Sequence, residues 1–106
     1  MGNETITATG SSGRKYTFYL YSWGTDFKKM GGVYMILRKT DHNGNHAVLY
    51  IGQTGDLSER FDHHHKKSCF DRNRKTHIAV LVESAELNRR NIESDLIRNY
   101  IPYCNN

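Results

Sequence analysis

The chain has 106 residues, with 15 lysines and arginines, 11 aspartates and glutamates and 6 histidines, which gives a formal net charge of +4. We expect a chain of this length to form one compact domain that can fold without metal or disulfide staples, with no second binding module. The modest positive charge favours an anionic partner, and the lack of a long apolar run or a strongly amphipathic basic helix argues against a membrane surface.

The N-terminal segment up to Gly13 is polar and rich in threonine, serine and glycine, without the basic start and apolar middle of a signal peptide. We expect residues 1–13 to be a flexible N-terminus and residues 14–106 to form the folded domain. Cys69 and Cys104 are the two cysteines, and a disulfide framework in a chain this short normally has more. We expect free thiols in a reducing compartment and a cytoplasmic protein.

The first predicted strand runs from Lys15 to Ser22, where apolar and polar residues alternate. Its tyrosines and lysines have two interpretations. They suit single-stranded nucleic acid, because bases stack on aromatic rings while lysines hold phosphates. They equally suit a sheet whose aromatic side chains cover one of its faces.

Three further strands are predicted at Val33–Leu37, Ala47–Ile51 and Ile78–Val82. The first two flank Asn43-Gly44, a strong hairpin signal, so they should pair antiparallel and bring Tyr34 and Tyr50 onto one sheet. The pattern predicts an α+β fold with a small antiparallel β-sheet of three core strands and an extra N-terminal strand, flanked by helices.

The first predicted helix starts at Asp56, a good N-cap, and Glu59 could complete a capping box. At about 100° per residue, this helix places Arg60 and His64 on the stripe that normally carries aliphatic side chains. Either residue alone suits an ordinary half-buried position. Both together, beside a strand with a tyrosine, favour a functional site.

The segment from Lys66 to Lys75 is dense in lysine and arginine and is predicted to be a loop. Such a loop is usually a solvated surface, although its cations would also suit phosphate groups.

The last predicted helix is capped by Ser84, runs to Tyr100 and is stopped by Pro102. Glu93 lies near the centre of its apolar stripe. A carboxylate at such a position is paired, protonated or bound to a cation. The structural alternative is a salt bridge to Arg89 or Arg60.

Several of these residues follow one another in a recognisable order: Gly32-Val33-Tyr34, Tyr50-Ile51-Gly52, Arg60, His64, Glu93, Pro102 and Asn105. The order resembles that of GIY-YIG nuclease domains, with valine replacing isoleucine in the first motif and the second motif unchanged. The resemblance extends from Gly31 to Asn105. The 15 residues between Tyr34 and Tyr50 exceed the usual spacing of the family, which a longer hairpin loop would absorb. The small stand-alone members that act on single-stranded DNA resemble this chain in having an additional N-terminal segment.

The resemblance implies a metal-dependent endonuclease that hydrolyses DNA phosphodiester bonds. Glu93 would hold one divalent cation, Mg²⁺ or Mn²⁺, and Arg60 would contact the scissile phosphate. Tyr34, Tyr50 and His64 are alternative general bases, and the sequence does not decide among them. DNA, with a preference for single strands, is the expected partner, and the candidate substrate contacts are Gly52, Gln53, Thr54, Lys66, Lys67 and Asn105.

Two other classes of protein compete with a nuclease. A binding module of the same fold would need no buried carboxylate such as Glu93 facing its anionic ligand. A zinc protein would use side chains that lack a paired metal-ligand spacing, namely His63, His64, His65, Cys69 and His77.

Overall fold

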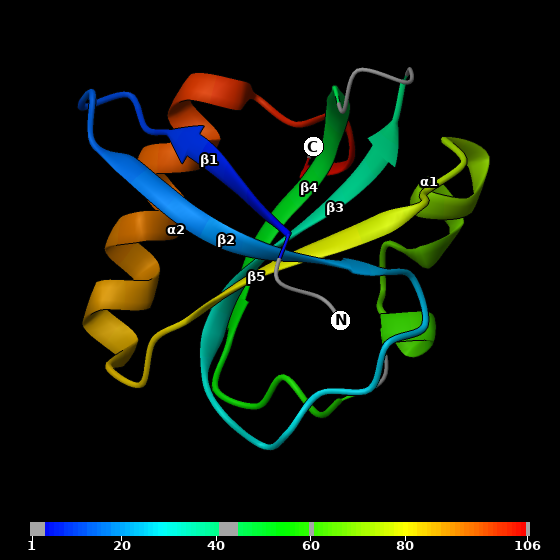
Figure 1. Ribbon diagram of the computed structural model, residues 1–106, viewed down its shortest axis with the longest axis horizontal. Coiled ribbons are helices and arrows are strands. Elements are labelled where there is room, and N and C mark those ends of the chain that lie inside the picture. The colour runs from blue at the N-terminus through cyan, green and yellow to red at the C-terminus, as the bar shows by residue number, and fades with distance from the viewer. Residues whose placement is uncertain (1–3, 41–44, 60, 106) are drawn as a thin grey trace.

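A computed structural model describes residues 4–40, 45–59 and 61–105. Five strands form one antiparallel sheet in the order β1-β2-β5-β3-β4. The sheet twists strongly, and α1 and α2 lie at opposite sides of it (Figure 1). In chain order the elements are β1 (Thr5–Thr9), β2 (Lys15–Ser22), β3 (Gly32–Lys39), β4 (His46–Thr54), the 3-10 helix η1 (Phe61–His63), α1 (Lys67–Arg72), β5 (His77–Val82), α2 (Glu86–Tyr100) and the 3-10 helix η2 (Tyr103–Asn105).

The four strands predicted from the sequence are all present as β2, β3, β4 and β5, and β3 pairs antiparallel with β4 as expected. The predicted Asn43-Gly44 turn between them lies outside the described residues. The expected strand number was too low, because β1 forms within the segment that we expected to be flexible. Ile6 and Ala8 alternate with threonines there, and Ile6 lies opposite Phe18 in β2. This short β-branched alternation is a strand signal that the polar composition obscured.

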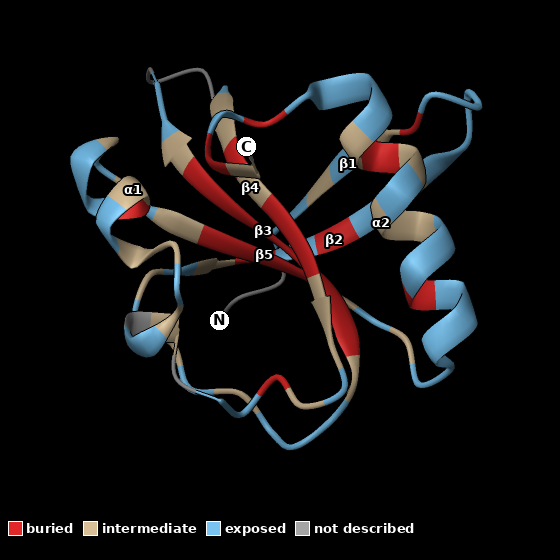
Figure 2. Cartoon of the chain, turned by 180° about the vertical axis from the view of Figure 1, so that it is seen from behind, coloured by how far each residue is buried: buried red, intermediate tan, exposed pale blue. Residues whose placement is uncertain are grey.

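The sheet separates two hydrophobic cores. The first core lies between the sheet and α2 and contains the buried Met35 and Leu96. The second lies on the opposite face, on the side of α1, and contains Tyr34 and Phe70. Successive residues of β3 therefore enter different cores, which explains why this strand is buried along most of its length (Figure 2).

The helix predicted from Asp56 does not form. The Asp56 carboxylate accepts hydrogen bonds from the backbone N–H and the hydroxyl of Ser58, which closes a local turn instead of capping a helix. Glu59 accepts a bond from the Thr54 hydroxyl and completes no capping box. The backbone N–H of Leu57 donates to the Met30 carbonyl at 2.8 Å, so tertiary contacts also hold this segment in a non-helical path.

The helix on this side is instead α1, which occupies part of the stretch that was predicted to be a basic loop. Phe70 in α1 is fully buried in the second core and anchors the helix. A single large apolar residue among many cations was too weak a periodic signal to indicate a helix.

The free-thiol prediction is wrong, because Cys69 in α1 and Cys104 in η2 form a disulfide with a Cα–Cα distance of 5.9 Å. The two cysteines are 35 residues apart and come together only because α1 and η2 pack on the same side of the sheet. Spacing alone could not reveal this proximity, since a disulfide depends on distance and direction in the folded chain.

Removal of this disulfide should destabilise the domain. For a closed loop of 35 residues, the loss of the cross-link is expected to lower the free energy of unfolding by about 3–4 kcal/mol. Guanidinium unfolding of the protein with and without dithiothreitol measures the effect, and the Cys69→Ser/Cys104→Ser variant should match the reduced protein. Identical unfolding midpoints for oxidised and reduced protein would contradict the disulfide.

The last helix, α2, confirms the predicted end at Tyr100 but begins at Glu86, with Ala85 rather than Ser84 at its N-cap. The backbone carbonyl of Ser84 accepts a hydrogen bond from Arg89 instead. None of the described helices combines the length and the apolar character needed to cross a membrane.

Candidate active site

Two tyrosines form the centre of the site. Tyr34 on β3 and Tyr50 on β4 both face the second core, with ring centroids 6.0 Å apart and an interplanar angle of 29°. Tyr34 lies opposite Gly52, and Tyr50 lies opposite Ile36. The rings are therefore diagonal neighbours on one face of an antiparallel pair, where large side chains can stack. This confirms the prediction that the two tyrosines share a sheet.

Gly52 makes room for this arrangement. A Cβ atom at this position would lie 2.7 Å from both Cζ and the hydroxyl oxygen of Tyr34 and 2.8 Å from Cε2 of Tyr50. The Tyr34 ring thus lies directly against the backbone of β4. Glycine is required here by the close approach of a rigid ring rather than by its backbone conformation.

Gly52→Ala should disturb both stability and chemistry. The added methyl group must displace two tyrosine rings, and overpacking of this kind costs about 1–3 kcal/mol of unfolding free energy. A displacement of about 1 Å at Tyr34 would reduce a cleavage rate by about 100-fold. Thermal unfolding and cleavage rates measure the two effects.

Gly55→Ala is the matched control, because the nearest atom to an added Cβ there is an Arg89 nitrogen at 3.6 Å, an ordinary contact. Equal behaviour of the two alanine variants would show that the contact between Gly52 and Tyr34 is unimportant.

His64 contacts the hydroxyl group of Tyr34, with 2.8 Å between Nε2 and the hydroxyl oxygen. The other ring nitrogen, Nδ1, accepts a hydrogen bond from the backbone N–H of Lys66 at 3.0 Å. An acceptor at Nδ1 requires that the neutral ring carry its proton on Nε2. His64 therefore donates to the oxygen of Tyr34, although it lies after η1 and not on the helix that we predicted.

Burial and the neighbouring cationic groups keep His64 neutral. Desolvation, followed by the charges of His65 and Lys66, lowers the pKa of His64 to about 4. The imidazole is thus uncharged at neutral pH and keeps the proton that it donates to Tyr34.

Both tyrosines are held in their protonated form. Burial is the largest cause that raises the pKa of Tyr34 well above its ordinary value, and the charges of Tyr50 and Glu93 add to it. Burial and the charge of Glu93 likewise raise the pKa of Tyr50. A negative charge at Glu93 therefore opposes the formation of a phenolate at either position.

A surface cleft of about 520 Å³ opens in front of Tyr34. Tyr34 and Phe61 supply its aromatic surface, with ring centroids 4.9 Å apart in an edge-to-face arrangement. The remaining lining residues are polar, namely Thr54, Asp56, Glu59, His63, His64 and His65. Aromatic rings beside imidazoles suit a ligand that has both planar bases and polar groups.

Glu93 lies on α2, which packs on the other side of the sheet and contacts β4. The Glu93 side chain is half-buried, and this burial raises the pKa of its carboxyl group, with Arg90 acting in the opposite direction. In the described part of the chain, Arg89 makes no ion pair with Glu93, so the salt bridge that was the structural alternative for Glu93 does not form with this arginine. The other suggested partner, Arg60, lies outside the described residues.

The site fits one hard divalent cation bound with water and phosphate oxygens. Mg²⁺ typically binds through one or two carboxylates and keeps several waters, and the half-buried Glu93 is a ligand of this kind. Among the described residues there is no group of three or more histidine, cysteine, aspartate or glutamate side chains that could hold a metal. The zinc alternative therefore lacks a ligand set in this part of the chain, and Cys69 is oxidised.

Arg89 is a buried residue that holds α2 against β4, a role that was not predicted from the sequence. Its side chain is only 7% exposed. Its guanidinium donates from Nε to the side-chain carbonyl of Gln53 and from Nη1 to the backbone carbonyls of Glu83 and Ser84. Arg89 thus ties α2, one turn before Glu93, to β4. In the sequence, this role was indicated only by the position of Arg89, four residues before Glu93 on the same face of the helix.

The other predicted substrate contacts have protein partners. Gln53 accepts from Arg89, and the Thr54 hydroxyl accepts a bond from the Asp56 backbone N–H. The Asn105 carboxamide accepts from the N–H of Ile51 and donates to its carbonyl, both at 2.9 Å. Lys67 forms an ion pair with Asp71 at 2.7 Å, and Lys66 is the N-cap residue of α1.

These contacts give Gln53, Thr54 and Asn105 positioning roles around Tyr50-Ile51-Gly52. Their contact with a substrate remains a prediction.

Residues 30–101 match the family described as the GIY-YIG catalytic domain. Comparisons with curated proteins and with solved structures give no match. The matched region contains both tyrosines, Gly52, His64 and Glu93, and it covers more than half of the chain. The chain therefore belongs to the GIY-YIG catalytic domain family, which implies a nuclease that acts on phosphodiester bonds of DNA.

Proposed function

We propose that this nuclease is an endonuclease that hydrolyses phosphodiester bonds within DNA, with a preference for single strands, and that it uses Mg²⁺ or Mn²⁺ at Glu93. The observation that carries the proposal is the hydrogen bond between His64 and Tyr34 at the wall of the cleft. This bond holds the Tyr34 oxygen at a fixed position beside the cleft, as a group that transfers protons requires.

We assign the role of general base to Tyr34. His64 cannot accept a proton in this arrangement, because Nδ1 is already bonded to the Lys66 N–H and Nε2 carries the proton. The same N–H of His64 stabilises the oxygen of Tyr34 when it loses its own proton to the solvent, and the phenolate can then take a proton from the attacking water. Tyr50 has no comparable bond to an imidazole in the described part of the chain.

Glu93 links proton transfer to metal binding. Its negative charge raises the pKa of Tyr34, so neutralisation of that charge on metal binding favours the phenolate. A bound divalent cation would also supply positive charge next to the phosphate oxygens. Arg60 is proposed to contact the scissile phosphate, since a guanidinium suits its developing charge.

The preference for single strands is supported by the aromatic surface of the cleft. Phe61 is half-buried at the cleft and offers a ring on which an unpaired base can stack, whereas Tyr34 is only 5% exposed. The aromatic segment of β2 offers less support than we expected, because Phe18 is fully buried and Tyr21 packs against Phe27. In β2, Tyr19 is 49% exposed, and its ring is accessible to a base.

The test is cleavage of matched single-stranded and duplex oligonucleotides of mixed sequence with Mg²⁺, with Mn²⁺ and with a chelator. We expect metal-dependent internal cuts that are faster in the single strand. Binding without cleavage under every metal condition would instead establish a non-catalytic module of the same fold. Equal rates on both substrates would refute the strand preference alone.

A further inference from the structure

A second cleft, of about 460 Å³, lies at the far end of β3 and carries four cationic side chains. Arg38 and Lys39 come from the end of β3, and Arg72 and Arg74 come from the end of α1 and the turn that follows it. Thr40 and Thr76 complete the lining. No aspartate or glutamate is among these described lining residues, so the cleft is a concentrated positive surface with hydroxyl groups beside it.

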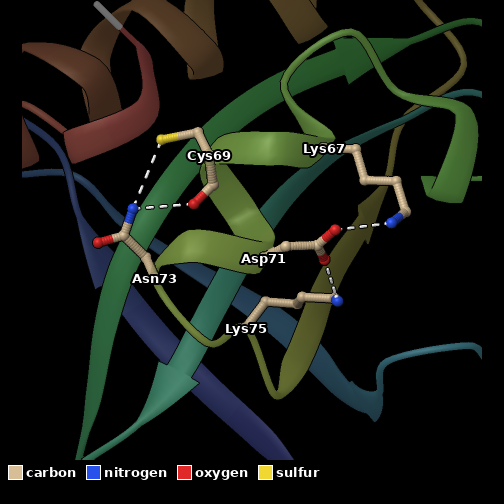
Figure 3. A network of polar contacts seen from close by, with 5 residues as sticks. All are labelled: Lys67, Cys69, Asp71, Asn73 and Lys75. Atoms are coloured by element: carbon tan, nitrogen blue, oxygen red, sulfur yellow. Dashed lines mark hydrogen bonds and ion pairs between the residues drawn. The ribbon is translucent and has the colours of Figure 1, made fainter.

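These cations differ from the other lysines near α1. Lys67 and Lys75 both form ion pairs with Asp71 (Figure 3), and Lys75 also lies over the ring of Trp23 at 5.0 Å. Within the described residues, no carboxylate pairs with Lys39, Arg72 or Arg74. Asp71 thus offsets part of the charge of Lys67 and Lys75, whereas no such pair in the described residues offsets Lys39, Arg72 or Arg74.

Hydrogen bonds hold two of the cationic residues in place at the cleft. Arg38 donates from Nη1 to the Asn73 backbone carbonyl at 3.2 Å, which holds its guanidinium against the C-terminal end of α1. Lys39 is held by its backbone N–H, which donates to the Thr76 hydroxyl at 2.8 Å. The exposed Arg72 and Arg74 face the same space from the other side.

The cleft shares a face of the sheet with the active site. Side chains alternate along β3, so Arg38 lies on the same face as Tyr34, four residues earlier. Four residues of strand span about 13 Å. α1 runs alongside, with His64 just before its start and Arg72 in its last turn. A DNA strand with its scissile phosphate at Tyr34 would therefore reach the cleft within a few nucleotides.

We propose that this basic cleft is a second phosphate-binding site, which holds the backbone of the DNA strand several nucleotides away from the bond that is cut. The inference rests on the proposed function, because it takes DNA as the ligand. It assigns affinity and strand placement to Arg38, Lys39, Arg72 and Arg74, while Tyr34, His64 and Glu93 perform the reaction. The cleft therefore sets a minimum substrate length.

Binding of a fluorescently labelled 12-nucleotide single strand, measured by anisotropy in chelator at several salt concentrations, tests the cleft without any cleavage. Arg72→Gln/Arg74→Gln should weaken binding about 10- to 30-fold at 0.1 M salt. It should also reduce the slope of log affinity against log salt by about 1.4, or 0.7 for each lost phosphate contact. Lys39→Gln, which leaves α1 intact, should reduce the slope by about half as much.

The matched control is Arg14→Gln/Arg98→Gln, which removes two exposed cations, one just before β2 and one on α2. An equal loss of affinity and slope in this control would overturn the proposal, because net charge alone would then explain binding. Absence of cleavage by the wild type with these binding results unchanged would refute the proposed reaction but not the cleft.

Discussion

Glu93→Gln is expected to reduce metal-dependent DNA cleavage by about a thousandfold or more. The substitution removes the one carboxylate that we assign to the cation, and the electrostatic contribution of a catalytic metal amounts to several kcal/mol of barrier height. The amide has nearly the same shape as the carboxyl group, so the helix and its contact with β4 should be retained. Single-turnover cleavage in Mg²⁺ and in Mn²⁺ measures the loss.

The stability of the Glu93→Gln variant provides an independent check. Burial raises the pKa of Glu93, so the folded state favours the protonated carboxyl, and stability is lost as pH rises from the unfolded pKa through the folded one. A neutral amide avoids this loss, and the variant should be at least as stable as wild type at pH 7. Glu86→Gln changes the same charge at an exposed position of α2 and should cleave normally. Full cleavage by Glu93→Gln would remove Glu93 from the mechanism.

Tyr34→Phe is expected to lower the cleavage rate by about a thousandfold, within the range of general base catalysis. The variant loses only the hydroxyl group that contacts His64. The pH dependence separates a base from a packing residue. Because the pKa of Tyr34 is raised above its ordinary value, the phenolate fraction, and with it the wild-type rate, should increase about tenfold per pH unit from pH 6 to 9. The variant should show no such increase.

Two comparisons make this test specific. Tyr19→Phe, on the exposed side of β2, should leave both the rate and its pH dependence unchanged. Tyr50→Phe should retain the pH dependence even if its rate falls. If Tyr50→Phe abolishes the pH dependence and Tyr34→Phe keeps it, the assignment of the base must be reversed.

The elements that could be predicted are those with a strong local signal and a matching tertiary environment. β2 has the predicted bounds, and the other predicted strands lie within β3, β4 and β5, because apolar residues recur there with the period of a pleated strand. The half-buried position of Glu93 could be predicted for a related reason, since the carboxylate lies inside an apolar stripe of the helix. The pairing of Tyr34 with Tyr50 followed from the antiparallel hairpin.

The features that could not be predicted depend on contacts between distant segments. The turn at Asp56 forms because Ser58 and Met30 compete with the helix for hydrogen bonds. The disulfide requires α1 and η2 to meet across 35 residues. The donor role of His64 depends on one backbone N–H, that of Lys66. Such interactions leave no periodic pattern in a sequence, so only the folded arrangement shows them.

The position of Asn105 has a consequence for the behaviour of the protein in solution. β4 is the outermost strand on its side of the sheet, and an open strand edge offers N–H and carbonyl groups to strands of other molecules. The Asn105 carboxamide occupies both groups of Ile51, as a neighbouring strand would. The adjacent Cys104 holds η2 in place through the disulfide. The C-terminal residues therefore cover the open strand edge beside Tyr50, where another molecule could otherwise add a strand.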